Sequence, residues 1–309
     1  MFLLSETTKP NILIALGSPS DLRLLEQVKY DENICLCLSV ASAHRTPKAV
    51  EAHAKAMDWD YVIAGAGLTN ALANDYARLV DCPVIAVPIG QADTQRGYAS
   101  ILSSTELPPG MPVASVQIND LEFALESAKH FDKCARNCNG HAKAFMFFES
   151  YDKSAFARAH KLADEMGLHL ENVTYMDDEG MELAESGLAI AVYDDDRPIK
   201  TDFPLIATRT TRKKTDYSDT PANMLHVGVN YSPNLILYVA KIFARTNPEI
   251  REFLAQHLAK GREKYKPFQP GVAAYEKQEE DSEYRKLALP IPISSQEHLE
   301  KLANWEVKK

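Results

Sequence analysis

The chain has 309 residues, of which 45% are apolar and 25% are charged, proportions typical of a globular protein and not of a disordered one. Its net charge of −9 at pH 7 argues against a nucleic-acid partner, because nothing supplies the basic face that a phosphate backbone needs. No stretch reaches the roughly 18 apolar residues of a membrane helix, and the N-terminus, MFLLSETTKP, is too short and too polar for a signal peptide. We therefore expect a cytoplasmic protein with no membrane partner.

Short apolar runs alternate with amphipathic segments through the first part of the chain. The runs predict buried strands at residues 11–16, 34–40, 61–64, 83–88 and 113–118. The intervening segments predict helices that start near residue 21 and cover residues 47–57, 68–80 and 121–131. This alternation predicts an α/β fold in which helices cover both faces of a parallel sheet. The expected architecture is a three-layer, flavodoxin-like or Rossmann-like domain.

A polar break at residues 136–143 separates this pattern from a second one. After it, strands are predicted at residues 144–148, 188–193, 205–208 and 226–230, and helices at residues 154–166 and 233–244. The last strand–helix pair echoes the one at residues 113–131, which indicates a diverged internal duplication. We expect two tandem related domains, residues 8–138 and 142–262, followed by a tail, residues 263–309, that packs on its own domain or on a neighbouring subunit.

The five cysteines, an odd number, favour reduced and buried thiols in a cytosolic protein. Cys134, Cys138 and His141 lie close together in the sequence and suggest a metal site. Their spacing is not that of a zinc knuckle, and no fourth ligand is evident nearby. We therefore expect no bound metal.

The first candidate loop follows the first predicted strand and reads GSPSD, residues 17–21. Ligands of parallel sheets bind at the carboxyl ends of the strands, where this loop lies. Its small residues, exposed N–H groups and two serine hydroxyls suit a phosphate at a helix N-terminus. Asp21 suits ribose hydroxyls or an amine. The alternative is that Ser20 or Asp21 merely caps the helix.

The second candidate loop follows the second strand and reads SAHRTP, residues 42–47. Pro47 suits the first position of a helix, so the strand delivers His44 to the ligand crevice. Histidine is the side chain best matched to moving a proton near neutral pH, and Arg45 suits a phosphate or a carboxylate. The alternative is that His44 is an ordinary exposed histidine of a loop.

The third candidate loop follows the third strand and reads AGAGLTNAL, residues 64–72. Its glycines permit a close approach of the backbone, and Thr69 and Asn70 offer polar contacts. The alternative is a glycine turn in which Thr69 or Asn70 caps the next helix. Each loop by itself is a weak signal, but three such loops after three successive strands of one sheet are expected to converge on one crevice.

These loops, together with the segment SSTELPPGMPVASV at residues 103–116, resemble the aminoimidazole ribonucleotide (AIR) carboxylase family of purine biosynthesis. The resemblance covers about residues 10–135, in the right order and spacing, and the pair GSxSD with SAH[RK]T is specific. It implies that AIR and carbon dioxide are the substrates and that 4-carboxy-AIR is the product, on the route to IMP. It also implies that no metal, biotin or nucleotide cofactor is required.

The resemblance assigns the role of proton shuttle to His44. The other candidates are implied to bind substrate: the first loop holds the phosphoribosyl part, the second closes around the phosphate and base, and the third forms the pocket for carbon dioxide and the carboxylate. These substrate-binding candidates are Gly17, Ser18, Ser20, Asp21, Ser42, Ala43, Arg45, Gly65, Gly67, Thr69, Asn70 and Leu72.

The family has two branches, and the sequence has features of both. Residues 69–72, TNAL, are similar to the third loop of the branch that uses carbon dioxide directly. Arg45, Thr46 and Pro47 look more like the mutase branch, which moves a carboxyl group from the N5-carboxylated nucleotide to the ring, and so does the stretch at residues 83–88. The carboxylase branch also tends to carry arginine where this chain has Glu106. Direct carboxylation is the first hypothesis, the mutase the second, and a non-catalytic nucleotide-binding scaffold a further alternative.

The second half lacks the three loops. Where the histidine loop would recur, residues 175–180 read YMDDEG, and the acidic residues there and at 194–196 are expected to lie in solvated loops. His226 is expected to be a strand residue and not a catalytic one. The chain is therefore predicted to carry one working site. Because family members are usually octamers of a single domain, a tandem chain is expected to form a homo-oligomer, a tetramer that mimics the octamer.

Overall fold

The computed structural model describes residues 9–67, 70–90, 95–138, 143–148, 153–173, 187–193, 204–209, 224–229, 232–264 and 290–305. In the first half of the chain, strands and helices alternate. They are β1 (Asn11–Leu16), the 3-10 helix η1 (Pro19–Gln27), β2 (Cys35–Val40), α1 (Pro47–Ala54), β3 (Tyr61–Gly67), α2 (Ala71–Leu79), β4 (Val84–Ile89), α3 (Gln95–Thr105), β5 (Ala114–Ser115) and α4 (Leu121–Asn137).

The second half contains a further set of strands and helices, and the end of the chain adds one more strand and helix. They are β6 (Lys143–Phe148), α5 (Lys153–Glu165), β7 (His169–Val173), β8 (Leu188–Tyr193), β9 (Leu205–Arg209), β10 (Met224–Val229), α7 (Ser232–Phe243), α8 (Pro248–Lys264), β11 (Ile291–Ile293) and α9 (Gln296–Ala303). Within the described residues, no helix combines the length and the apolar character needed to cross a membrane.

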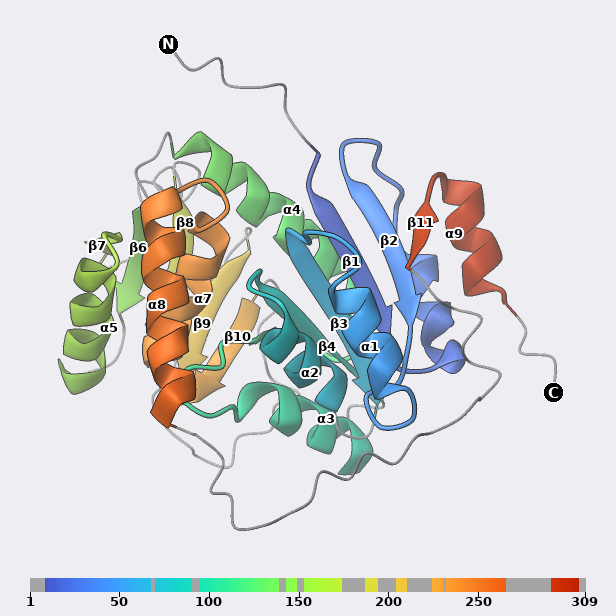
Figure 1. The fold of residues 1–309 in the computed structure, drawn as a ribbon, viewed down its shortest axis with the longest axis horizontal. Coiled ribbons are helices and arrows are strands. Elements are labelled where there is room, and N and C mark those ends of the chain that lie inside the picture. The colour runs from blue at the N-terminus through green and yellow to red at the C-terminus, as the bar shows by residue number, and fades with distance from the viewer. Residues whose placement is uncertain are drawn as a thin grey trace.

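One sheet of 11 strands runs through the described part of both halves, in the order β11-β2-β1-β3-β4-β5-β10-β9-β8-β6-β7 (Figure 1). Within each half the strands are parallel. The orders β2-β1-β3-β4-β5 and β7-β6-β8-β9-β10 are the same, and each is the flavodoxin-like order. His226 of β10 pairs antiparallel with Ser115 of β5 and joins the halves. The predicted α/β class with a mainly parallel, helix-covered sheet is confirmed.

The central strands are buried on both faces, which explains why they read as continuous apolar runs. Successive residues of β1 point to opposite faces of the sheet. Ile12 and Ile14 belong to the core cluster that also contains η1 and α4 residues, whereas Leu13 and Ala15 belong to the cluster with α1 and α2 residues. Helices therefore cover both faces, and Figure 1 shows α1 and α2 on the near face.

The described part of the C-terminal tail packs on the first half of the chain. Strand β11 pairs antiparallel with the edge strand β2, with Ile293 opposite Leu36. Helix α9 lies against η1 and buries Leu299 completely. An open sheet edge exposes unpaired backbone groups that can pair with another chain, so the tail protects this edge.

Several elements differ from those predicted. Strand β5 covers only Ala114–Ser115 and not residues 113–118, and the chain has a positive φ of 62° at Asn119. Helix α2 starts at Ala71 and not at residue 68, and the polar residues 136–137 form the last turn of α4. Helices α3 and α8 and strand β7 had no strong apolar pattern and were not predicted.

The burial of His226 and of the five cysteines bears on the predictions made for them. His226 is a buried strand residue, as predicted. All five cysteines are free, and Cys134 and Cys138 are buried, but Cys35 is exposed, so the prediction of buried thiols is wrong for that residue. Among the described residues no group of three potential ligands surrounds a metal position, and His141 lies outside them.

Candidate active site

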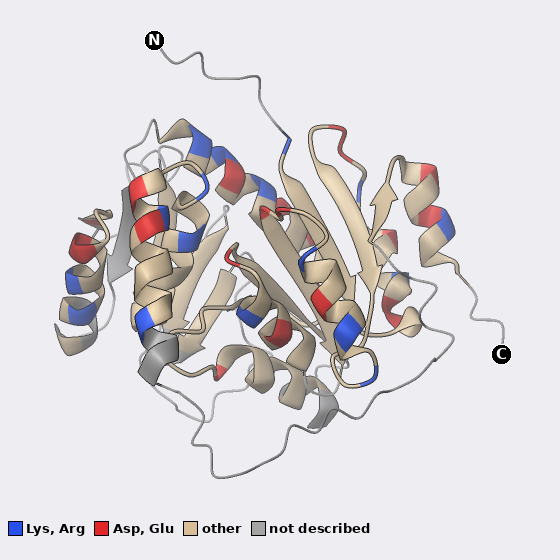
Figure 2. Ribbon diagram, viewed as in Figure 1, with Lys and Arg blue, Asp and Glu red and all other residues tan. Residues whose placement is uncertain are grey.

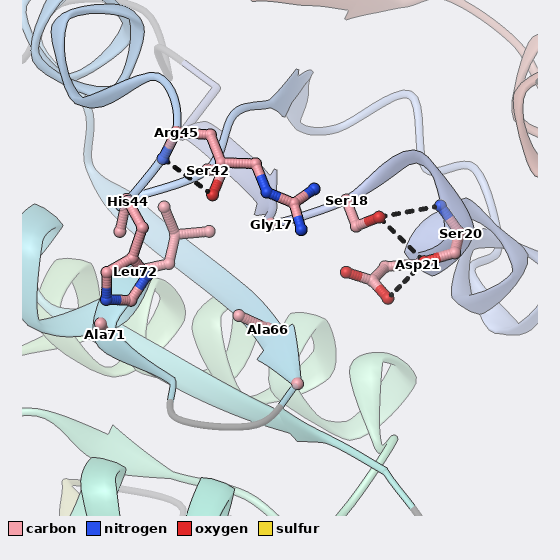
Figure 3. Close-up of a pocket in the computed structure, with 12 residues that line it drawn as sticks. Gly17, Ser18, Ser20, Asp21, Ser42, His44, Arg45, Ala66, Ala71 and Leu72 are labelled. Carbon is pink, nitrogen blue, oxygen red and sulfur yellow. Dashed lines mark hydrogen bonds between the residues drawn. The ribbon is translucent and has the colours of Figure 1, made fainter.

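Three loops from the first half converge on one cavity of about 370 Å³ (Figure 3). The loops follow β1, β2 and β3, and the start of α2 completes the wall. Because β1 lies between β2 and β3, the cavity is at the switch point of the sheet, where ligands of this topology bind. Its volume falls within the usual range for small-molecule sites. The lining residues are Gly17, Ser18, Ser20, Asp21, Ser42, Ala43, His44, Arg45, Ala66, Gly67, Ala71 and Leu72.

The first loop is held against the third by its backbone. The N–H group of Gly17 donates to the carbonyl of Gly65 over 2.9 Å. A Cβ atom at position 17 would lie 3.0 Å from the Cβ of Ala66, so only glycine fits without displacing the neighbouring wall. The glycine at position 17 therefore reflects the close approach of the ends of β1 and β3.

Hydroxyl and carboxylate groups cluster at the start of η1. Ser18 is the N-cap residue, and its Oγ accepts hydrogen bonds from the N–H (3.4 Å) and Oγ (2.9 Å) groups of Ser20. The cap is thus Ser18 and neither Ser20 nor Asp21. Asp21 is only 8% exposed, and burial raises the pKa of its carboxyl group, against the lowering effects of the Ser20 hydroxyl and the Arg23 charge. The cavity therefore contains a carboxyl group that favours its protonated form more than a solvated one does.

The second loop is a compact turn stabilised by its own side chains. The Oγ1 atom of Thr46 accepts from the N–H of Ser42 (2.9 Å) and donates to the carbonyl of Ser42 (3.2 Å). The Oγ of Ser42 in turn accepts the N–H of Arg45. These bonds fix the backbone on both sides of His44.

The two side chains that the second loop presents point to different parts of the cavity. Figure 3 shows the imidazole of His44 beside Ala71 and the guanidinium of Arg45 extended toward Ser18. Both residues are exposed. The His44 ring lines the cavity and has no hydrogen-bond partner among the described residues. A cation near the N-cap of η1 and an accessible imidazole at the opposite wall suit an anionic ligand that exchanges a proton.

The third loop contributes Ala66 and Gly67 to the cavity. Of its two polar residues, Thr69 lies outside the described residues. Asn70 is fully buried, does not line the cavity, and its amide donates to the carbonyls of Ala64 and Val87 over 3.3 Å each. It therefore ties together β3 and β4. Gly65 lies within β3, below the cavity.

Helix α3 supports the third loop and was not anticipated from the sequence. The Oγ of Ser100 donates to the carbonyl of Ala66 (3.0 Å), and the Oγ of Ser103 accepts the N–H of Asn70 (2.8 Å). These contacts leave little signal in the sequence, because serines in an unrecognised helix resemble loop residues. Ala66 and Ala71, which also line the cavity, lack any chemical signature in sequence.

This fold and cavity define an α/β protein with a small-molecule site at the carboxyl end of a flavodoxin-like sheet. The family model described as AIR carboxylase matches residues 11–132. An N5-carboxyaminoimidazole ribonucleotide mutase of Methanocaldococcus jannaschii is 42% identical over 117 residues, which cover 37% of this chain and 73% of that protein. The corresponding mutase of Thermotoga maritima is 35% identical over 121 residues, covering 37% and 70% of the two chains.

A phosphoribosylaminoimidazole carboxylase of Saccharomyces cerevisiae is also similar, at 34% identity over 123 residues, covering 38% of this chain and 21% of that protein. The matched region includes all three loops that line the cavity. The chain belongs to the AIR carboxylase family.

Proposed function

We propose that this chain carboxylates AIR with carbon dioxide to give 4-carboxy-AIR in purine biosynthesis. The observation that carries the proposal is the convergence of the three loops on one cavity, with the exposed imidazole of His44 in its wall. The family membership of residues 11–132 supports the same reaction class.

The residues of the cavity suit the parts of the substrate. The hydroxyls of Ser18 and Ser20 and the guanidinium of Arg45 bind the phosphoribosyl group, because all three are donors near the start of a helix. Asp21 lies deeper and binds a hydroxyl or the amine of AIR. Ala66, Gly67 and Leu72 form a small wall against which carbon dioxide is held.

The chemistry needs positioning and one proton acceptor. The ring carbon of AIR is part of an enamine, and its electron pair attacks the carbon of carbon dioxide to form the new C–C bond. One C=O π pair moves onto oxygen and becomes the carboxylate. The ring carbon then carries both the carboxylate and its original hydrogen, and His44 removes that proton so that the ring regains its conjugation. Holding both reactants in one cavity replaces a bimolecular encounter with a positioned one.

The N5-carboxyaminoimidazole ribonucleotide mutase reaction is the second candidate, because curated relatives with that name are up to 42% identical to this chain. In this reaction the N–C bond of the carbamate breaks, carbon dioxide is released within the cavity, and the ring carbon recaptures it. His44 then supplies a proton to the nitrogen and accepts one from the ring carbon. The same residues serve both reactions, and only the source of carbon dioxide differs.

An isotope experiment separates the two reactions. Purified protein receives AIR with ¹³C-bicarbonate in one assay and the N5-carboxylated nucleotide with ¹³C-bicarbonate in another, and the product is analysed by mass spectrometry. Direct carboxylation predicts labelled product from AIR. Unlabelled product from the N5-carboxylated nucleotide, with no product from AIR, would identify the mutase. No product in either assay would contradict both reactions.

We also propose that the chain is a tandem duplication with one working site and that it assembles as a tetramer. The identical strand order in the two halves supports the duplication. The positions in the second half where the first and second loops would recur, residues 149–152 and 174–180, lie outside the described residues. Light scattering tests the assembly, and a monomer in solution would contradict it.

A further inference from the structure

The second half contacts the first through a buried asparagine at the start of α7. Asn234 is 1% exposed, and its Oδ1 accepts the N–H of Gly110 over 2.9 Å while its Nδ2 donates to the carbonyl of Pro108 over 3.2 Å. One side-chain amide thus pairs with two backbone groups of one turn in the other half. Gly110 has a φ of 86°, which disfavours other residues, and this conformation aims its N–H at Asn234.

The turn that Asn234 holds follows closely after α3. The N–H of Glu106 bonds to the carbonyl of Leu102 (2.8 Å), so the helical hydrogen bonds extend to Glu106, and the turn begins at Pro108. The end of α3 also lies against β10, where a Cβ at Gly228 would be 3.7 Å from the carbonyl oxygen of Thr105. The second half therefore fixes where the C-terminal end of α3 lies.

Helix α3 in turn fixes the third loop of the cavity. Ser100 donates to Ala66, a lining residue, and Ser103 accepts from the N–H of Asn70. Asn74 of α2 donates to the carbonyl of Ser103 (3.1 Å), so the start of α2 is held as well. Because these bonds reach both the third loop and α2, a shift of α3 along its axis would move Ala66 and the start of α2 together.

We propose that Asn234 is a positioning residue for the cavity: it fixes the end of α3, and through Ser100 and Ser103 it fixes the wall formed by Ala66, Gly67 and Ala71. As far as turnover is concerned, this inference rests on the proposed function. On this proposal the second half contributes to the reaction by holding the wall of the cavity in the first half in place.

Lys241 of the same helix provides a matched control. It is 3% exposed, and its Nζ donates to the carbonyls of Val80 and Cys82 in the first half, at 3.3 and 3.2 Å. These carbonyls precede β4, at the amino-terminal ends of the strands, whereas the cavity lies at their carboxyl ends. Asn234 and Lys241 thus both donate to backbone carbonyls of the other half, but the Asn234 bonds go to the turn after α3, whereas these Lys241 bonds go to the segment before β4.

The test compares Asn234→Ala, Asn234→Asp and Lys241→Met in the full chain by hydrogen exchange and steady-state kinetics. Asn234→Ala should speed amide exchange in peptides spanning residues 66–74, which include the Asn70 N–H, and leave the second-loop peptide at residues 41–47 unchanged. It should lower kcat/KM about tenfold or more, because small misplacements of reacting groups are costly. Asn234→Asp keeps the acceptor for Gly110 and should fall between this variant and the wild type.

Lys241→Met should lower the melting temperature but leave both exchange in residues 66–74 and kcat/KM at wild-type values. Unchanged exchange at residues 66–74 in Asn234→Ala, or an equal effect of Lys241→Met there, would overturn the inference. Hydrogen exchange requires no substrate, so a failure of the proposed reaction in every variant, wild type included, would leave this readout intact.

Discussion

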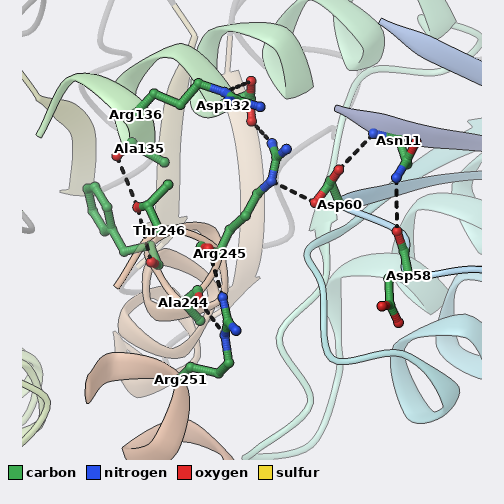
Figure 4. A network of polar contacts seen from close by, with 11 residues as sticks. Asn11, Asp58, Asp60, Asp132, Ala135, Arg136, Ala244, Arg245, Thr246 and Arg251 are labelled. Carbon is green, nitrogen blue, oxygen red and sulfur yellow. Dashed lines mark hydrogen bonds and ion pairs between the residues drawn. The ribbon is translucent and has the colours of Figure 1, made fainter. Parts of the chain in front are cut away.

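Arg245 of the second half reaches Asp60 of the first, and its Nε lies 2.6 Å from Oδ1 of that carboxylate (Figure 4). Its guanidinium also forms an ion pair with Asp132 of α4, which is bonded to Arg136 over 2.8 Å. Asp60 receives the N–H of Asn11 at the start of β1. One arginine therefore connects the end of α7 to both a central strand and a covering helix of the other half.

Replacement of Arg245 by alanine should destabilise the chain by about 2–4 kcal/mol, because the largely buried Asp60 loses its ion pair with Arg245 and Asp132 keeps only its pair with Arg136. Arg245, Asp60 and Asp132 side chains are each less than 20% exposed. Urea unfolding measures the change. The control is Lys55→Ala, which removes an exposed ion pair with Glu51 and should leave the unfolding midpoint unchanged. Equal urea midpoints for both variants would show that the ion pairs of Arg245 do not stabilise the contact between the halves.

Asp21→Asn should stabilise the folded chain at pH 7 while lowering activity. Burial raises the pKa of Asp21, so the folded state binds a proton more tightly than the unfolded state. The contribution of Asp21 to stability is therefore fully present below the unfolded pKa and is lost as pH rises through the folded pKa. Asparagine avoids the cost of burying the charge, so its advantage in thermal unfolding should shrink as pH falls toward 4. A less stable variant at pH 7 would contradict this assignment.

The same substitution should raise KM for AIR roughly 10- to 100-fold, the usual effect of losing a hydrogen bond to a charged group. The comparison variant is Arg23→Ala, because Arg23 is exposed and does not line the cavity. It should change KM little.

Leu299→Ala should destabilise the chain by about 3 kcal/mol, because the side chain is completely buried between the tail and η1. Lys301→Ala on the exposed side of α9, a helix that carries both acidic and basic residues (Figure 2), should have no measurable effect. Thermal unfolding and light scattering check both variants. If the tail protects the edge strand β2, Leu299→Ala should also increase self-association of the chain, and an unchanged particle size on warming would argue against that role.

The sequence predicted most strands of the sheet and most of the cavity, because those features leave local signals. Strands buried on both faces are apolar runs, and the loops at their ends carry residues with evident chemistry, such as His44 and Asp21. The role of Asn70 could not be predicted, because an asparagine that bonds to strand carbonyls and one that bonds to a ligand look the same in sequence. Contacts between distant segments, such as those of Asn234 and Arg245, depend on how the two halves meet, which no local pattern encodes.

The most direct test of the account is the turnover of AIR with bicarbonate, and of the N5-carboxylated nucleotide, by wild-type protein and by His44→Asn, followed by ultraviolet absorbance. The account predicts turnover by the wild type and a loss of at least about 100-fold in His44→Asn, with the melting temperature unchanged because His44 is exposed and its ring has no hydrogen-bond partner among the described residues. Full activity of His44→Asn, or no turnover of either substrate by the wild type, would contradict it.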